Sequence, residues 1–161
     1  MNPLPLRKIP SAIRIFLTLV LTFLAVQSGT LAQSSDGEPS QVAVNFLNTY
    51  VKAAASFTNG EKSVTQWMAK EPLVTERFRK ALARLYRNAR ARDPESGYGA
   101  DPIVGGQDFP DEFRLVSTLI EGETARVVLI GTDPGFPMEV KVVLIQTSGK
   151  WFVDGSGDLY N

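Results

Sequence analysis

The sequence predicts a single α+β domain in which three helices come first and an antiparallel sheet of about four strands follows. Apolar residues recur at steps of three and four between Ala43 and Ala89, and at period two from Phe113 onward. Short turns that contain glycine separate the strand-like segments, which favours hairpins between neighbouring strands. Helices segregated from an antiparallel sheet are typical of an α+β domain, with the helices packed on one face of the sheet.

The first 32 residues have the features of a secretory leader. Three basic residues precede an uncharged apolar run, Ile15–Val26, and small residues at Thr30 and Ala32 predict cleavage after Ala32. As a helix this run would be about 18 Å long, shorter than the roughly 30 Å hydrocarbon core. We therefore expect an exported protein, periplasmic or secreted, with no stable membrane span after cleavage. A leader retained as an anchor is the alternative.

The absence of two residue types excludes several kinds of chemistry. The chain has no cysteine, so it has no disulfide, no thiol nucleophile and no lipid anchor on cysteine. It also has no histidine, which removes the usual general base near neutral pH and nearly all zinc sites. The segment DPIVGGQD lacks the alternating acids of a calcium loop. We expect no metal and no cofactor, and we assign no catalytic residue.

The charge balance gives no sign of a polyanion partner. The leader carries three of the 17 basic residues and no acid, which leaves 14 basic against 17 acidic residues, a formal charge of −3. This value suits a soluble protein. We expect no nucleic acid among its partners.

Three helices are predicted after a flexible linker at residues 33–39, QSSDGEP. Ser40 is the expected N-cap of the first, whose apolar residues run from Ala43 to Ala54. Ser63 and Gln66 form a capping-box pattern that predicts a short second helix through Met68. The third is expected from about Leu73 to Arg92, where Asp93-Pro94 ends it.

The strands are expected at Phe113–Ile120, Thr124–Gly131, Met138–Gln146 and Lys150–Gly155. In the second strand, Ala125, Val127 and Leu129 share one face. The middles of the second and third strands are apolar on both faces, which predicts that the second face of the sheet is also shielded by curvature, a loop or a partner chain. A curved sheet wrapped on a helix would leave an apolar pocket.

Four stretches give the chain a family resemblance: VAVNFLNTYVKA, LVTERFRKALARLY, DPIVGGQDF and KWFVDGSG. On these the chain resembles the exported bacterial domain family DUF3828, a domain of unknown function in the NTF2-like, cystatin-like group. The likeness spans roughly Ser40 to Gly157, so residues 40–161 are taken as the domain. It implies a cone-shaped α+β fold with a strongly bent sheet around a pocket, and no established reaction or substrate.

The loop from Gly97 to Phe109, GYGADPIVGGQDF, has two interpretations. In one, Asp101 fixes a turn, and Ile103, Val104 and Phe109 staple the loop over the sheet. In the other, polar side chains of the loop bind a ligand in a pocket, and a carboxyl whose pKa is raised by an apolar wall could serve as a general base. The candidate ligand-binding residues are Tyr98, Asp101, Gln107 and Asp108.

The third helix carries a basic face, and this face also has two interpretations. Seven cations lie on it, from Arg77 to Arg92. They could bind an acidic partner or anionic lipid, with Arg84 and Arg87 as the candidate partner-binding residues. Alternatively they are solvated side chains whose stems cover apolar surface.

Two tryptophans and one aspartate are interpreted mainly as structural residues. Trp67 and Trp151 are expected in the core or the pocket wall. Asp154, at the end of the last strand, could face the pocket mouth, although a turn-forming role before Gly155 is favoured.

Three functions follow from these observations. The first is a non-catalytic module that binds a small ligand or an envelope protein. The second is a histidine-free enzyme, a hydrolase or isomerase that uses a pocket carboxylate. The third is a scaffold or inhibitor subunit that forms a homodimer through its exposed sheet face.

Overall fold

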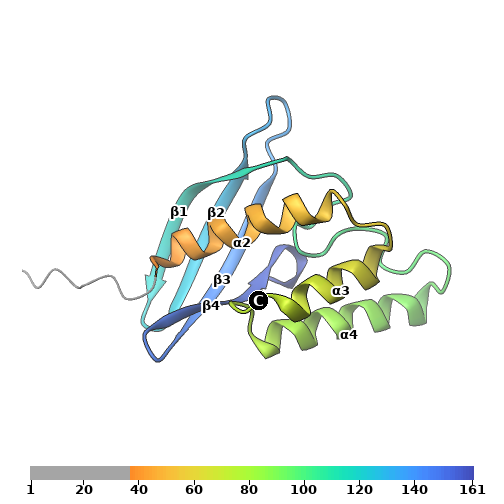
Figure 1. Cartoon of the computed structure of the whole chain (residues 1–161), viewed down its shortest axis with the longest axis horizontal. Helices are drawn as coiled ribbons and strands as arrows, with labels where there is room; N and C mark the ends of the chain where they lie inside the picture. The colour runs from red at the N-terminus through yellow and green to blue at the C-terminus, as the bar shows by residue number, and fades with distance from the viewer. Residues whose placement is uncertain (1–36) are drawn as a thin grey trace, which may run out of the picture. The chain divides into compact units, whose positions relative to one another are not determined.

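The computed structural model describes residues 37–161, and its elements form one α+β unit (Figure 1). Three helices, α2 (Pro39–Ala54), α3 (Gly60–Lys70) and α4 (Glu76–Arg92), come before four strands, β1 (Phe113–Glu121), β2 (Thr124–Gly131), β3 (Glu139–Thr147) and β4 (Lys150–Ser156), and a short 3-10 helix, η1 (Gly157–Leu159). The predicted α+β class is confirmed. The predicted leader, its cleavage after Ala32 and residues 33–36 of the linker lie outside the described residues.

The sheet is an antiparallel meander in the order β1-β2-β3-β4. Helix α2 lies across one face and contacts all four strands. The side chains of Ala125, Val127 and Leu129 point to this face and are buried, as the period-two pattern predicts.

Large side chains fill the space between the helices and this face of the sheet. Tyr50, Phe78 and Phe113 are fully buried there. Trp67 packs edge-on against Tyr50 with the ring centroids 5.0 Å apart, and Trp151 is also buried. Both tryptophans thus belong to the core or its border. The inner face of the sheet is packed solid in its middle, where the sequence predicted an apolar pocket.

The second face of the sheet is only partly covered, so the prediction that it is shielded holds in part. Val143 is buried on that side, where the Leu159 carbonyl lies close to Gly155. The neighbouring outward side chains on β2 to β4 are half-buried: Val128, Ile130, Ile145 and Phe152. Strand β1 is exposed along its length after Phe113.

Two predicted helix starts lie too late in the sequence, by two residues in α2 and by four residues in α3. Helix α2 begins at Pro39, with Glu38 as N-cap, and not after Ser40. Proline suits the first helical position, since its missing N–H would have no partner there. Helix α3 begins at Gly60 after Asn59, so Ser63 lies inside the helix and makes no capping box.

The third helix, in contrast to the first two, begins later than predicted, because the residues before it pair with β4. Val153 N–H donates to the Leu73 carbonyl at 2.7 Å, and Thr75 N–H donates to the Val153 carbonyl at 2.9 Å. Thr75 is then the N-cap of α4, its hydroxyl accepting from Phe78 N–H at 3.1 Å. The segment Leu73–Thr75 therefore pairs with the outer edge of β4 at Val153.

Candidate functional site

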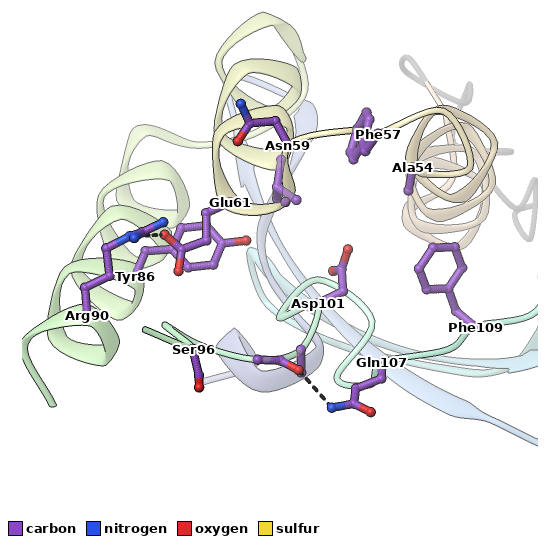
Figure 2. A pocket seen from close by; sticks show the side chains of 14 residues that line it. Ala54, Phe57, Asn59, Glu61, Tyr86, Arg90, Ser96, Asp101, Gln107 and Phe109 are labelled. Carbon is purple, nitrogen blue, oxygen red and sulfur yellow. Dashed lines mark hydrogen bonds and ion pairs between the residues drawn. The ribbon is translucent and has the colours of Figure 1, made fainter. Parts of the chain in front are cut away.

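A hollow of about 680 Å³ opens at one end of the helices, beside the loop that joins α4 to β1 (Figure 2). No lining residue belongs to a strand. The lining comes from the end of α2, the connection to α3, the start of α3, α4 and the loop: Ala54, Phe57, Asn59, Gly60, Glu61, Val64, Tyr86, Arg90, Ser96, Gly99, Ala100, Asp101, Gln107 and Phe109. We refer to this space as the hollow.

The loop wall of the hollow is a compact turn built around Asp101. The Asp101 N–H donates to the Gly106 carbonyl at 2.8 Å, and its carbonyl accepts from Gly105 N–H at 2.9 Å. Its carboxylate Oδ1 accepts from Ile103 N–H at 2.9 Å, as expected for an aspartate that fixes a turn. Ile103 and Val104 are buried, so the turn is anchored in the core.

The same loop is fastened to the residues after β4. The Ser156 hydroxyl donates to the Ile103 carbonyl at 2.7 Å, and Asp158 N–H donates to the Pro102 carbonyl at 3.0 Å. Between them Gly157 has a φ of +55°, and a Cβ there would lie 2.6 Å from the carbonyl oxygen of Ile103. Only glycine allows this close approach. The hydrogen bonds to the residues after β4 therefore fix the conformation of the loop that forms this wall of the hollow.

Both carboxylate oxygens of Asp101 have partners. Oδ1 binds Ile103 N–H, and Oδ2 accepts a hydrogen bond from the buried Tyr50 hydroxyl. Burial raises the pKa of Asp101 above its ordinary value, although the hydrogen bonds that it accepts act in the opposite direction. Burial, together with the Asp101 charge, raises the pKa of Tyr50. Tyr50 therefore stays a neutral donor, and Asp101 links the loop to α2.

Tyr86 contributes a hydroxyl that has no hydrogen-bond partner among the described residues. The residue as a whole is only 6% exposed, and Figure 2 shows the hydroxyl end directed into the hollow. Burial is the main cause that raises the pKa of Tyr86, and the nearby charges of Asp101 and Glu61 raise it further. The hydroxyl therefore remains protonated at neutral pH. A phenolic hydroxyl in this position can donate a hydrogen bond to an acceptor that enters the hollow.

Glu61 and Arg90 form the outer rim of the hollow. Arg90 Nε donates to Glu61 Oε2 at 2.7 Å. The other oxygen of Glu61 accepts weakly from Tyr98 N–H at 3.4 Å. Among the lining residues, two carboxylates thus oppose one guanidinium, and aromatic rings of Phe57 and Phe109 form the apolar part of the wall.

The structure separates the four loop residues predicted to bind a ligand. Asp101 and Gln107 line the hollow, and Gln107 Nε2 is bound to the Gly99 carbonyl at 3.0 Å. Tyr98 does not line it; its hydroxyl donates to Asp158 Oδ2 at 2.6 Å. Asp108 is exposed and also lies outside the lining. Burial and the bond to Asp158 raise the pKa of Tyr98 to about 12.

The basic face of α4 is smaller than the sequence suggested, because several of its cations are bound within the domain. Arg77 pairs with the buried Asp154, which thereby joins β4 to α4 and has neither the predicted turn-forming role nor a position at the mouth of the hollow. Arg79 donates to the carbonyls of Met68 and Glu71. Arg84 and Arg87 are exposed and have no ion-pair partner in residues 37–161. Arg84 borders a smaller hollow of about 260 Å³ that also includes Tyr98.

Sequence reasoning missed Tyr86 and Glu61 as parts of the hollow. Tyr86 lies on the apolar face of α4, where its spacing from Leu82 indicates a core residue. Glu61 is in the first turn of α3. The signal that could have found Tyr86 is its hydroxyl on an otherwise apolar helix face, since a largely buried tyrosine directs that group to a polar partner or to solvent.

Residues 37–161 contain neither a candidate metal site nor a helix that could span a membrane. No group of three or more acidic side chains there could hold a metal ion. The helices of this part of the chain are each too short or too polar to cross a membrane.

Comparison with known proteins gives a likeness of fold only. The chain matches no protein-family model and no curated protein. It is similar to a chain in the crystal structure of the type VI native effector–immunity complex Tae3–Tai3 from Ralstonia pickettii, with 20% identity and a TM-score of 0.50 over 77% of this chain and 98% of that chain. The selenomethionine crystal of that complex gives 21% identity and a TM-score of 0.47 over the same shares.

Proposed function

We propose that this protein is a non-catalytic binding module of the cell envelope, and that the hollow holds a small ligand or a side chain of an envelope protein. The observation that carries the proposal is the Tyr86 hydroxyl, which points into the hollow without a partner among the described residues. Such a group is stabilised when a ligand that excludes water supplies an acceptor.

The lining favours a ligand with an apolar body and a neutral or cationic polar group. The rings of Phe57 and Phe109 offer an apolar surface, and the carboxylates of Glu61 and Asp101 outnumber the Arg90 guanidinium. An anionic group would meet the excess negative charge, whereas an amide carbonyl could accept from Tyr86.

Three further points belong to the same proposal. The α+β order of elements supports membership of the DUF3828, NTF2-like group, with its cone-shaped sheet. The leader features support export to the periplasm or beyond. The likeness to a chain of an effector–immunity complex supports a protein as the partner, because that chain functions in a protein–protein complex.

The test is a binding titration with three probes that share a ring and differ in charge: benzylamine, benzamide and benzoate. Amide signals of residues 99–109 are followed by two-dimensional NMR. We expect benzamide and benzylamine to shift these signals and benzoate to have a much weaker effect. Loss of the Tyr86 hydroxyl in Tyr86→Phe should weaken benzamide binding roughly three- to tenfold, the value of one neutral hydrogen bond.

Tyr98→Phe is the matched control, because it removes a phenolic hydroxyl that lies outside the hollow. It should leave benzamide binding unchanged. If none of the probes shifts the loop signals, or if both tyrosine variants behave alike, the hollow is not a ligand site and the proposal is wrong.

A second candidate function, a carboxylate-dependent enzyme, is favoured by one observation: burial raises the pKa of Asp101. Against it, both oxygens of Asp101 are engaged by Tyr50 and Ile103. Turnover of ester and amide model substrates that falls at least ~100-fold in Asp101→Asn would establish the enzyme. A folded Asp101→Asn variant with the same background rate as the wild type would exclude this role.

A further inference from the structure

Strand β1 is an open sheet edge that carries large exposed apolar side chains. It is the first strand in the order β1-β2-β3-β4, and no other described strand pairs with its outer side. The exposed fractions on it are Leu115 42%, Val116 53%, Leu119 55% and Ile120 51%. An edge of this kind is a template for pairing with another chain, and soluble proteins normally blunt it with charge, proline or a covering segment.

The beginning of this edge is already closed. The side chain of Asn48 accepts from Phe113 N–H at 2.7 Å and donates to the Phe113 carbonyl at 3.0 Å. The other sheet edge, β4, is interrupted at Val153, where Leu73 and Thr75 bond to its backbone. The unprotected stretch in the described chain is therefore Arg114–Glu121, with the sequence RLVSTLIE.

A bulge in β1 determines which side chains share a face. The pairing with β2 skips Val116, so Arg114, Ser117, Leu119 and Glu121 face outward, and Leu115, Thr118 and Ile120 face the helix side. Without the bulge Arg114 and Glu121 would lie on opposite faces, because side chains alternate along a strand.

We propose that a second copy of this chain occupies the edge, with the two β1 strands antiparallel about a two-fold axis through Thr118. If Val116 is again left unpaired, Thr118 lies opposite Thr118 of the second copy and Leu115 lies opposite Ile120. Arg114 then lies opposite Glu121 at both ends. In every pair both side chains lie on the same face of the sheet. A single register therefore places opposite charges together and apolar side chains together, and it agrees with the alternation of side chains along the strands.

The backbone agrees with this register. The Glu112 carbonyl bonds Thr132 on the β2 side, and the backbone of Phe113 turns away to Asn48. Alternation along an antiparallel ladder then directs the N–H and C=O groups of Leu115, Thr118 and Ile120 to the free edge, once the bulge is counted. These are the residues that the proposed register places opposite one another as hydrogen-bonded pairs.

Arg114 is available for the contact. It is exposed and has no ion pair among the described residues. Glu121 binds Arg126 of its own hairpin through one oxygen, Oε2 at 2.5 Å, and its other oxygen has no hydrogen-bond partner in residues 37–161. The inference is independent of the proposed ligand site, because β1 supplies no residue to the hollow.

The test reverses one charge of the proposed pair in one variant and the other charge in a second variant, and then mixes the two. Contacts within a single copy cannot produce the expected recovery of dimers. The full chain is expressed and purified, and its mass in solution is measured by sedimentation. Arg114→Glu and Glu121→Arg each create two like-charge pairs in the homodimer, so each should raise the dissociation constant at least ~10-fold. Mixing the two variants should restore dimers, because the glutamate introduced at position 114 of one copy then meets the arginine introduced at position 121 of the other. Native mass spectrometry would show the mixed species.

A cross-link gives a second readout. Opposed residues of a hydrogen-bonded pair have Cα atoms about 5.5 Å apart, within the range for a disulfide. The chain has no native cysteine, so Thr118→Cys should form a covalent dimer on mild oxidation, whereas Thr147→Cys, an exposed control on β3, should not. A wild type that stays monomeric up to about 100 µM, or dimers unaffected by both charge variants, would overturn the proposal. Capture of another protein by a monomeric wild type but not by Leu119→Arg would assign the edge to that protein instead.

Discussion

The ion pair between Arg77 and Asp154 should stabilise the fold more than any exposed salt bridge in the described chain. The Asp154 side chain is only 5% exposed, and it accepts from Arg77 Nε at 2.7 Å and from the Thr75 hydroxyl at 2.5 Å. In Arg77→Ala the buried carboxylate would keep only the hydroxyl. Breaking a buried pair costs about 3–5 kcal/mol, and because the guanidinium is 60% exposed, water replaces part of the loss. We expect a decrease of about 2–3 kcal/mol in the free energy of unfolding.

The assay is urea unfolding followed by the fluorescence of Trp67 and Trp151, which both pack in or beside the core. For a domain of this size the expected loss corresponds to a melting temperature lower by roughly 8–12 °C. Arg84→Ala is the control, since Arg84 lies exposed on the same helix without an ion pair in the described chain. It should cost less than about 0.5 kcal/mol.

A double-mutant cycle isolates the pair itself. In an Asp154→Asn background, Arg77→Ala should cost much less, because the residual buried group is neutral. If Arg77→Ala costs no more than Arg84→Ala, or costs the same in the wild-type and Asp154→Asn backgrounds, the pair does not hold α4 to β4 and the reasoning fails.

Three further predictions use the same unfolding measurement. Gly157→Ala should lose about 2 kcal/mol or more, since φ is +55° and the added Cβ would strike the loop carbonyls; an unchanged midpoint would contradict this. Thr75→Val should lose about 2 kcal/mol, as the cap of α4 and the bond to Asp154 both disappear, and Thr75→Ser should recover most of it. Burial raises the pKa of Asp101 in the folded state, so the stability that its proton provides is complete below the ordinary value of 3.8 and is lost as the pH rises through the folded value. Wild type should therefore lose stability relative to Asp101→Asn between about pH 4 and neutrality, and a constant difference would show that Asp101 does not titrate in this way.

The strands could be read from the sequence because alternation of side chains is a local property. Ala125, Val127 and Leu129 are buried on one face, as their spacing indicates, and the turn at Glu121-Gly122-Glu123 lies where the sequence predicts it. The helix starts were harder, since they depend on which of several capping signals prevails. At α4 the deciding factor is the pairing of Leu73–Thr75 with Val153, a contact between residues far apart in the chain.

The hollow could be predicted only in part, because it also depends on contacts between residues far apart in the chain. Asp101 stood out because an aspartate before a proline has a local turn-forming role, which the structure contains. Its partner Tyr50 lies 51 residues away on the face of α2 that the helical pattern assigns to the core. Arg77 and Asp154 are 77 residues apart. Nothing in the spacing of residues indicates such a pair, so its arginine was counted with the solvent-facing cations.

The two edges of the sheet differ, because a segment outside the sheet bonds to β4 whereas β1 is open, and this difference limits how far an assembly through strand pairing can extend. Leu73–Thr75 bonds to Val153 at the outer edge of β4, so a molecule that joined a neighbour along β1 would offer the next molecule only an interrupted edge in residues 37–161. A closed pair is therefore favoured over further growth through strand pairing. If two β1 strands pair as proposed, the hydrogen bonds of Leu73 and Thr75 to Val153 would therefore hinder strand pairing at the opposite edge of the sheet.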